Sequence, residues 1–426
     1  MNTPPNHKLW VYCLWPAVAM SLGWGLRGFI GGGPLGAMIP GAMIGLLLCF
    51  LLGLDKKTSV FVAVFATIGV GFGGQMTYGQ TIGFVVRPET FGWGVLGLTV
   101  KGGVWGLIGG AVIGLGFIQR QIPKRHTVTG LVLLLLGTLV GWKLINEPKL
   151  IYFSDPLVKP RAEIWAGLLI GTIFLLTHLA SQRHAKIPLH FALWGALGGA
   201  IGFGGGGLWM WLGKALSPEL RWVSWWKLME FTFGFCFGLT LGYAAWLKRA
   251  VLAAVPANLE PEAARSRSIG WVLLITALVG FASLWLETNL TINSTFTFVG
   301  VGLLIISIYS ERLAWQIALT VTYSAFALDL AEYFYKERKM GDAFTGWMFV
   351  LATSLAFGYL VAKRVRSGEP MVKWGFLLVM WTAVLVSVAK TLMHPPPFES
   401  FGLVQGIFFL DTILLAVWLR GKNAPA

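Results

Sequence analysis

Long apolar stretches recur along the whole chain and constrain its fold more than any motif does. About fourteen segments of roughly 18 to 25 residues contain few charges, and each is long enough to cross ~30 Å of hydrocarbon as an α-helix. Hydrophobic residues make up 56% of the chain and charged residues only 12%, against ~25% charged residues in soluble domains. The sequence therefore predicts an all-α, polytopic integral membrane protein. The expected spans are 9–30, 33–54, 58–80, 92–118, 127–145, 163–181, 189–213, 225–247, 269–287, 296–310, 313–334, 344–362, 372–391 and 401–419.

Lysine and arginine gather in alternate connections between these spans, for example at Lys56-Lys57, Lys124-Arg125 and Lys248-Arg249. Because positively charged short loops stay on the cytoplasmic side, we expect both termini in the cytoplasm and the protein in an inner or plasma membrane. The formal net charge of +15 predicts contact with anionic lipid at the cytoplasmic face. No basic stripe interleaved with aromatics indicates nucleic acid as a partner, and the oligomeric state stays open.

Known catalytic and cofactor motifs are missing from the sequence. It contains no Walker loop, HExxH or GxSxG, which removes ATP hydrolysis by the chain itself and most hydrolase chemistry. It also contains no dinucleotide fingerprint in its required context, a strand followed by a glycine-rich turn and a helix. Cys13, Cys49 and Cys236 lie in apolar segments without metal-ligand spacing, so neither a zinc site nor a disulfide framework is indicated. We therefore expect no cofactor, no metal and no catalytic residue of a known class.

Two glycine patterns recur at regular intervals. A glycine followed by an aromatic residue, as in Gly23-Trp24-Gly25 and Gly71-Phe72-Gly73, occurs near the outer end of five segments. Glycines four residues apart recur about every 65 residues, a spacing typical of internal repeats. Together the patterns predict helical hairpins, four in the first part as a parallel repeat of four plus four helices. The four-apart pairs are Gly41/Gly45, Gly106/Gly110, Gly167/Gly171 and Gly234/Gly238.

The polar stretch around Pro256–Ser268 divides the chain. We expect a glycine-rich membrane domain at 1–249, a cytoplasmic linker loop at 250–268 and a second membrane domain of about six helices at 269–426. Four consecutive glycines cost a helix about 1 kcal/mol each relative to alanine. We therefore expect Gly204–Gly207 to break its helix, and Gly31–Pro34 to form a re-entrant turn.

Charged residues inside the apolar segments are the first candidate site residues, because charge at membrane depth requires a partner or a function. Arg27 suits a carboxylate, phosphate or sulfate bound through two parallel hydrogen bonds, although pairing with a membrane acid would equally explain it. Lys101 is the second cation, and Glu163 and Glu230 are its natural acid partners. An ion pair and a ligand site are both open for Lys101.

Polar side chains and bare backbone add further candidates for binding a solute. Gln75, Tyr78 and Gln80 form a polar patch near the outer end of the third segment. The equivalent place in the second repeat holds Gly204, Gly205 and Gly206, so one copy offers side chains and the other offers backbone. The alternative for the polar patch is ordinary hydrogen bonding between helices, worth ~0.6 kcal/mol for each bond.

Acidic residues at membrane depth are the candidates for carrying a proton or an ion. These are Glu163 and Glu230 in the first part, and Asp329 and Glu332 in the second. Asp329 and Glu332 are three residues apart and share one helical face. Lys336 lies close enough in sequence to be an ordinary ion-pair partner for them.

These features favour a secondary or facilitated transporter, or a permease, for a small anionic or polar solute. Internal repeats, irregular helices and cations at membrane depth are the features that transporter sites combine. A membrane-embedded enzyme for a lipid-linked or amphipathic substrate is the alternative and requires two titratable groups in one cavity. A structural subunit of a membrane complex is the third possibility. The residues do not identify the solute.

Overall fold

Helices account for all regular structure in the computed structural model, which describes residues 7–27, 32–157, 160–216, 220, 223–254, 270, 273–274, 277–278, 295–337, 339, 341–393 and 402–421. No strand occurs within these ranges. The α-helices are α1 (Leu9–Arg27), α2 (Gly33–Leu52), α3 (Lys56–Gly73), α4 (Gly79–Val85), α5 (Phe91–Ile118), α6 (Lys124–Gly141), α7 (Trp165–Ser181), α8 (Lys186–Ala215), α9 (Trp225–Ala253), α11 (Thr295–Ser307), α12 (Glu311–Gln316), α13 (Thr322–Glu332), α14 (Ala343–Ser367), α15 (Val372–Met393) and α16 (Gly402–Arg420). The expected all-α architecture is confirmed.

Ten helical segments of the described ranges are long and apolar enough to cross a membrane, and two further apolar helices, Trp165–Ser181 and Phe296–Ser307, are shorter. This is compatible with an integral membrane protein. The expected number of fourteen spans is not confirmed, because the predicted span 269–287 lies largely outside the described residues.

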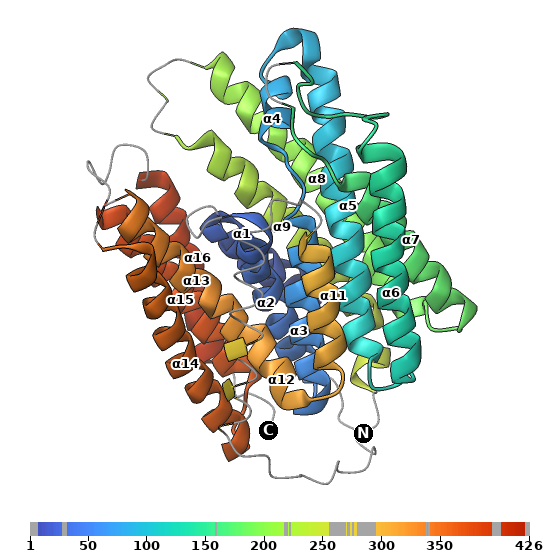
Figure 1. Ribbon diagram of the computed structural model, residues 1–426, viewed down its shortest axis with the longest axis vertical. Coiled ribbons are helices and arrows are strands. Elements are labelled where there is room, and N and C mark those ends of the chain that lie inside the picture. The colour runs from blue at the N-terminus through green and yellow to red at the C-terminus, as the bar shows by residue number, and fades with distance from the viewer. Residues whose placement is uncertain are drawn as a thin grey trace.

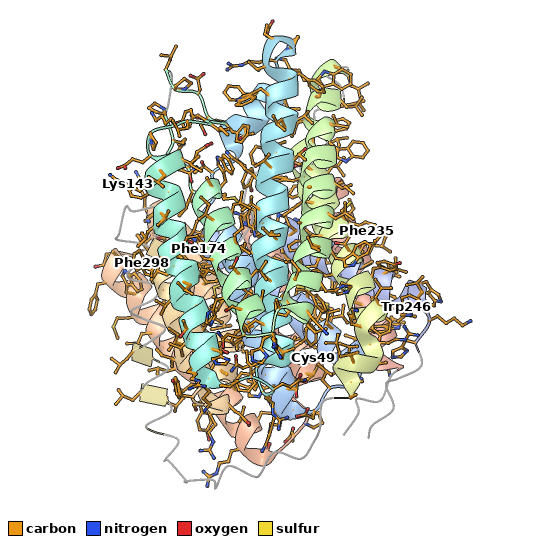
Figure 2. All side chains as sticks on the ribbon, turned by 90° about the vertical axis from the view of Figure 1, so that its right-hand side faces the viewer. Cys49, Lys143, Phe174, Phe235, Trp246 and Phe298 are labelled. Atoms are coloured by element: carbon orange, nitrogen blue, oxygen red, sulfur yellow. The ribbon has the colours of Figure 1, made fainter. Side chains whose placement is uncertain are left out.

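Large apolar side chains on the outer faces of the helices fit the same setting. Phe174, Phe235 and Phe298, all labelled in Figure 2, are 38%, 38% and 47% exposed. Soluble monomers rarely leave wide apolar patches in water, whereas hydrocarbon accommodates such side chains. The exposed residues of these helices are therefore suited to contact with lipid.

Local capping signals set the helix ends at the end of the bundle where basic residues gather. Gly53 ends α2 with a left-handed backbone, φ 62° and ψ 37°, which glycine adopts without steric cost. The Asp55 carboxylate then accepts hydrogen bonds from the backbone N–H groups of Lys57 and Thr58, so it caps the first turn of α3. Arg120, just beyond α5, donates to the same carboxylate at 3.0 Å.

Glycines let α5 and α8 meet backbone to backbone. A Cβ atom at Gly106 would overlap the carbonyl oxygen of Gly195, and one at Gly199 would overlap the carbonyl oxygen of Gly102. Such close approach gives van der Waals packing where lipid supplies no hydrophobic force between helices.

The other glycine pairs spaced four apart pack in the same way against different helices. Each member of these pairs lies close to atoms of a neighbouring helix. Gly41 and Gly45 of α2 pack against α3, Gly167 and Gly171 of α7 against α6, and Gly234 and Gly238 of α9 against α1. Two of these pairs thus pack against the next or the preceding helix of the chain, whereas the pair in α9 packs against the distant helix α1. The helix pairs are not equivalent, so the parallel repeat stays a prediction.

Helix length divides the bundle into two heights. The helices α1, α2 and α3 have 19, 20 and 18 residues, whereas α5, α8 and α9 have 28, 30 and 29. At ~1.5 Å per residue the first set is about 15 Å shorter than the second. Figure 1 shows that the upper ends of α1 to α3 lie part-way along α5 and α8. The connection between α1 and α2 therefore begins beside the middle of the long helices.

The C-terminal helices pack along one side of α1, α2 and α3 (Figure 1). Among them, α11 and α12 contact α3, α13 and α15 contact α2, and α16 contacts α1. Lys56 also donates to the carbonyl oxygen of Val365 at the end of α14, at 3.0 Å. The predicted linker 250–268 lies outside the described residues after Ala254, and the predicted domain division stays a prediction.

The expected break at Gly204–Gly207 is wrong, because α8 runs without interruption from Lys186 to Ala215. Each unsatisfied backbone group would cost several kcal/mol among apolar helices, which outweighs the ~1 kcal/mol helix penalty of each glycine. Neighbours also use the missing side chains, since Gly206 lies against Met229 of α9 and Gly207 against Leu98 of α5. The glycines here permit packing and do not unwind the helix.

The predicted re-entrant turn at Gly31–Pro34 falls partly outside the described residues. Gly32 and Gly33 have φ values of 68° and 56°, a backbone region that favours glycine. Pro34 lies in the first turn of α2, where a missing N–H group has no cost. Within the described residues the chain therefore turns at Gly32–Gly33 and enters α2.

We expect Gly106→Ala to destabilise the protein and Gly205→Ala not to. The new methyl group at Gly106 would overlap backbone atoms of α8, whereas a Cβ at Gly205 meets no atom within 4 Å. Overpacking costs about 1–3 kcal/mol, while alanine in an open helical position gains up to ~1 kcal/mol. The midpoint of thermal unfolding in detergent measures both effects. Equal loss in the two variants would contradict the close contact between α5 and α8.

Candidate functional site

The Arg27 side chain lies where α1, the first turn of α2, the connection between α3 and α4, and α5 meet. Arg27 is the last residue of α1 and is only 3% exposed. A Cβ atom at Gly36 would lie 3.0 Å from the Arg27 Cγ atom. The absence of a side chain at Gly36, in the first turn of α2, therefore leaves room for the Arg27 side chain. The N-terminus of α2 has no side-chain cap, and helix N-termini favour negative charge.

Three aromatic rings surround the guanidinium group. Its carbon atom lies 5.2 Å from the ring centroid of Trp105, 5.5 Å from that of Tyr78 and 5.7 Å from that of Trp24. Trp105 is fixed in place because its Nε1 donates to the carbonyl oxygen of Val70 at 2.7 Å. A desolvated cation–π contact is worth up to ~2 kcal/mol. The rings therefore compensate part of the cost of burying this charge.

Within the described residues, hydrogen bonding leaves the Nε of the Arg27 guanidinium without a partner. Nη1 donates to the Tyr78 hydroxyl at 2.7 Å, and the buried Nε has no hydrogen-bond partner. No carboxylate of the described residues lies within 4.0 Å of Arg27. The expected alternative, pairing with a membrane acid, is thus not found in the described part of the chain.

Glu230 of α9 is connected to Arg27 through the Tyr78 hydroxyl, which donates to Glu230 Oε1 at 3.3 Å. Trp226 Nε1 donates to the same oxygen at 3.1 Å, and Lys227 Nζ donates to Oε2 at 2.6 Å. Lys227 also donates to the carbonyl oxygen of Gly25 in α1 at 3.0 Å. We call Arg27, Tyr78, Lys227 and Glu230 the Arg27 cluster. Its two cations and one carboxylate leave an excess of one positive charge.

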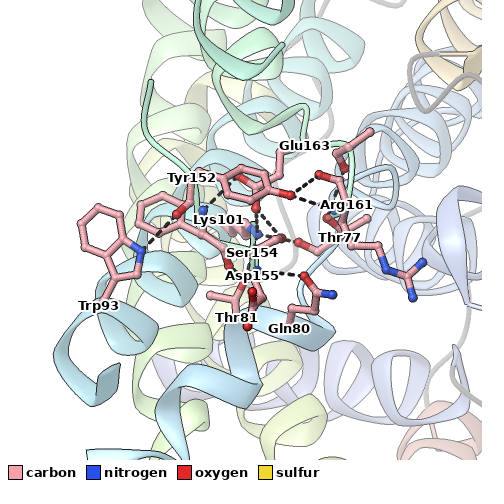
Figure 3. Close-up of polar contacts among 12 residues, drawn as sticks. Thr77, Gln80, Thr81, Trp93, Lys101, Tyr152, Ser154, Asp155, Arg161 and Glu163 are labelled. Atoms are coloured by element: carbon pink, nitrogen blue, oxygen red, sulfur yellow. Dashed lines mark hydrogen bonds and ion pairs between the residues drawn. The ribbon is translucent and has the colours of Figure 1, made fainter. Parts of the chain in front are cut away.

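A second buried network centres on Lys101 (Figure 3), which is 1% exposed in α5. Its ammonium group donates to Glu163 Oε1 at 2.7 Å, to Thr81 Oγ1 at 2.8 Å and to the carbonyl oxygen of Thr77 at 2.6 Å. All three ammonium hydrogens thus have acceptors. Lys101 pairs with Glu163 and not with Glu230, whose partner is Lys227.

Glu163 also fastens the connection between α6 and α7. Its Oε1 accepts from the Ser154 hydroxyl at 2.9 Å and its Oε2 accepts from the backbone N–H of Phe153 at 3.2 Å. Gln80 Oε1 accepts from the backbone N–H of Asp155 at 3.0 Å (Figure 3). The Lys101–Glu163 ion pair therefore joins this connection to α4 and α5.

Tyr152 closes the same connection at the surface. Its hydroxyl donates to the carbonyl oxygen of Arg161 at 2.8 Å and accepts from the backbone N–H of Arg161 at 2.7 Å. Partial burial raises the pKa of the Tyr152 hydroxyl above its ordinary value. The shift extends to higher pH the range in which the hydroxyl keeps the proton that it donates to the carbonyl oxygen of Arg161.

The connection between α3 and α4 joins the two networks. Thr77 offers its carbonyl oxygen to Lys101, and the next residue, Tyr78, bonds Arg27 and Glu230. A movement of this connection would therefore alter both sets of buried charges. Within the described residues, no group of three or more His, Cys, Asp or Glu side chains is arranged to hold a metal ion.

The remaining predicted site residues lie in other surroundings. Gln75 is bonded within the protein, since its Nε2 donates to Thr297 Oγ1 at 3.0 Å and its Oε1 accepts from the Thr297 backbone N–H at 3.1 Å. Gly204 and Gly206 form part of the packed surface of α8. Gln75 thus ties the end of α3 to the start of α11.

Asp329 and Glu332 lie in α13 of the C-terminal part. Glu332 is part of an exposed ion pair with Lys336 at 2.7 Å, which is the ordinary partner that the sequence also suggested. Neither residue belongs to the helices that build the Arg27 cluster or the Lys101 network. Their predicted role in carrying a proton or an ion stays untested.

Sequence reasoning missed the parts of the site that come from separate helices. Trp24 and Trp105 form the aromatic surround of Arg27, and Lys227 neutralises Glu230. Two signals were present in the sequence, since Trp24 belongs to the repeated glycine–aromatic pattern and Lys227 lies near Glu230 at membrane depth. Neither signal shows that these side chains converge on one place.

No family of known proteins, no curated protein and no solved structure significantly matches this chain. The argument for function therefore depends on the geometry of the chain itself.

We expect the Lys101–Glu163 pair to be strongly coupled. Lys101→Met and Glu163→Gln each strand a buried polar partner, and breaking a buried ion pair from one side costs about 3–5 kcal/mol. The double variant is expected to lose clearly less than the sum of the single losses. Unfolding midpoints of the two single variants and the double variant give this double-mutant cycle.

The exposed pair Lys143–Glu147, with side chains 66% and 41% exposed, is the matched control. Its coupling is expected to stay below ~0.5 kcal/mol, as for other exposed helical pairs. If the stability losses of the Lys101 and Glu163 variants are additive, the ion pair between them does not stabilise the protein.

Proposed function

We propose that this protein is a membrane transporter or permease for a small anionic solute, and that the solute binds at Arg27. The observation that carries the proposal is a guanidinium that is 3% exposed and meets no carboxylate in the described chain. Charge buried among apolar helices costs several kcal/mol. An anion would compensate that cost by pairing with the charge.

The free edge of the guanidinium indicates the shape of the solute. The Tyr78 hydroxyl occupies Nη1, and no described residue accepts a hydrogen bond from Nε. A solute that bonds Nε together with Nη2 would meet two parallel N–H donors. This fork matches a planar carboxylate, or two oxygens of a phosphate or sulfate. Because the Arg27 cluster has one positive charge in excess, it suits a monoanion best.

The surroundings of Arg27 support the same choice. Among the described residues, no atom lies within 4 Å of a Cβ placed at Gly32 or Gly33, at the uncapped N-terminus of α2. Helix N-termini present N–H groups and a positive dipole end to anions. Two independent sources of positive potential therefore converge on one place.

Binding energy would move the solute only if two accessible states of the protein differ in their contacts with it. The Tyr78 bridge offers such a difference, since Tyr78 bonds both Arg27 and Glu230 and lies in a short connection between helices. We propose that Glu230 couples a proton to the anion. Protonation would remove the negative charge of the cluster and raise its excess positive charge.

The proposal retains three predictions from the sequence that the fold leaves open. These are the total of about fourteen spans, the repeated hairpins, and both termini in the cytoplasm of an inner or plasma membrane. Lys56, Lys57, Arg120 and Lys124 lie at one end of the helices, and basic residues mark the cytoplasmic side. The Arg27 cluster would then lie toward the outer ends of α1 and α3.

We expect Arg27→Gln to weaken anion binding by about 100-fold or more. Loss of a buried, hydrogen-bonded charge costs about 2–5 kcal/mol in binding. The measurement is a thermal-shift screen of the detergent-purified protein against carboxylates, phosphates, sulfates, sugar acids and neutral sugars, followed by flux of the best ligand into liposomes. Arg249→Gln is the matched control, because Arg249 also stacks on a tryptophan, Trp246, but outside the cluster.

Three outcomes would contradict the proposal in different ways. Equal stabilisation of the parent and the Arg27→Gln variant would move the site away from Arg27. Arg27 would have a structural role if the Arg27→Gln variant unfolds while Arg27→Lys folds, and if anions stabilise neither Arg27→Lys nor the parent. A panel without any ligand would favour a lipid-directed enzyme or a complex subunit.

We expect Glu230→Gln to tighten anion binding and to remove its pH dependence. In the parent chain a bound anion favours protonation of Glu230, so affinity should rise as pH falls, and the two effects are reciprocal. The groups that contact Glu230 are Lys227, Tyr78 and Trp226, with Arg27 beyond Tyr78. Isothermal titration at several pH values measures the coupling.

Glu332→Gln is the comparison for this experiment, since Glu332 is the other candidate carrier. If Glu332→Gln removes the pH dependence and Glu230→Gln does not, the coupling belongs to α13.

A further inference from the structure

A cavity of about 320 Å³ lies at the basic end of the bundle, away from the Arg27 cluster. Residues after Asp55 in α3, the end of α5, the start of α6 and the turn between α11 and α12 line it. Figure 1 shows the lower ends of α3, α6, α11 and α12 together at this end of the molecule. Its volume is at the lower limit of ~300–1,000 Å³ for small-molecule sites.

Positive charge dominates the polar side of the cavity. Lys57, Arg120 and Lys124 line it, against the single carboxylate of Glu311. Arg120 is already engaged with Asp55 at 3.0 Å. Lys57 and Lys124 make no ion pair with a described carboxylate, so their ammonium groups are available to an anion.

The opposite side of the cavity is apolar. Phe61, Ile122 and Ile308 contribute to the lining and are themselves only 8%, 7% and 2% exposed. Tyr309 extends this side, and the Lys124 ammonium lies 5.0 Å from its ring centroid. A ligand that fits both sides must be negatively charged at one end and apolar at the other.

We propose that this cavity binds the phosphate group of an anionic phospholipid, with Lys57 and Lys124 on the phosphate and the start of the acyl chains on Phe61 and Ile308. Basic pockets between membrane helices on the cytoplasmic side are suited to phospholipid headgroups, and each lysine or arginine near an anionic membrane surface contributes attraction. Lysine is a compact point charge with three donors, which suits a phosphate without fixed orientation.

The position of the cavity gives the lipid a structural consequence. Its walls come both from α3, α5 and α6 and from the turn between α11 and α12. A ligand that contacts both walls binds the folded arrangement better than a separated one, and preferential binding stabilises the state that binds. The lipid would thus hold the C-terminal helices against the N-terminal ones. This inference does not depend on the transport proposal.

The test uses the full-length protein in detergent and measures binding by native mass spectrometry and by thermal shift. The probes are phosphatidylglycerol, phosphatidylcholine and glycerol phosphate. The variant is Lys57→Gln with Lys124→Gln, and the matched control is Lys186→Gln with Lys248→Gln, which removes two lysines from the ends of α8 and α9. Each single variant, Lys57→Gln and Lys124→Gln, is measured as well, in case the double variant does not fold.

We expect phosphatidylglycerol to bind the parent and the control equally well, and the cavity variant about tenfold more weakly, which corresponds to ~1.4 kcal/mol. Each single variant should show an intermediate loss. Unchanged affinity in the cavity variant would overturn the proposal, because the lipid would then bind the basic end as a whole. Equal binding of phosphatidylcholine would exclude a requirement for net negative charge, and equal binding of glycerol phosphate would make free phosphate esters the ligand and not lipid.

Discussion

Burial of charge among apolar helices is the constraint on which the rest of this structure depends. A charged side chain in such surroundings costs several kcal/mol unless it is paired. Lys101 meets Glu163 at 2.7 Å, and Lys227 meets Glu230 at 2.6 Å. The first pair joins α5 to the connection before α7, whereas the second lies within α9 and reaches α1 through the bond from Lys227 to Gly25. Arg27 departs from this pattern and is balanced by aromatic rings and one hydroxyl.

Glycine packing makes this arrangement possible. The backbone contact between α5 and α8 brings Trp105 and Phe203 into one aromatic cluster with Phe233 of α9. The equally close contact of α9 with α1 places Glu230 beside the last turn of α1, where Lys227 reaches the carbonyl oxygen of Gly25. With larger residues at these crossings the helices would stand further apart, and the buried charges would lose the short distances that offset their desolvation.

The two proposed sites lie at opposite ends of the short helices α2 and α3. The Arg27 cluster adjoins the start of α2 and the end of α3, whereas Lys57 of the basic cavity lies in the first turn of α3. Helices of 18 to 20 residues separate such ends by about 27–30 Å, close to the thickness of a hydrocarbon core. In this arrangement the solute site and the lipid site are divided by the least exposed helices of the bundle, and each can act without contact with the other.

Much of the fold was predictable, because a long apolar stretch has few alternatives to a helix when no water satisfies its backbone. The all-helical class with long apolar helices, the glycine pairs as packing positions and the charges of Arg27, Lys101, Glu163 and Glu230 can all be read from the residues. The prediction of a break at Gly204–Gly207 was wrong, because backbone groups left without hydrogen bonds cost more than the low helix propensity of glycine. The sequence left Gln75 open between solute binding and hydrogen bonding between helices, and its bond to Thr297, more than two hundred residues away, fits the second.

Sequence alone thus determined the all-helical class, which side chains are charged within apolar segments and where basic residues gather, since these follow from composition and local pattern. Only the tertiary structure decided the partners. Lys101 meets Glu163 of a different segment, whereas no described acid lies within 4.0 Å of Arg27, because helix crossings set by contacts between remote glycines fix which side chains of different helices can meet. Those contacts depend on the spatial order of the helices, and no local pattern in the chain encodes that order.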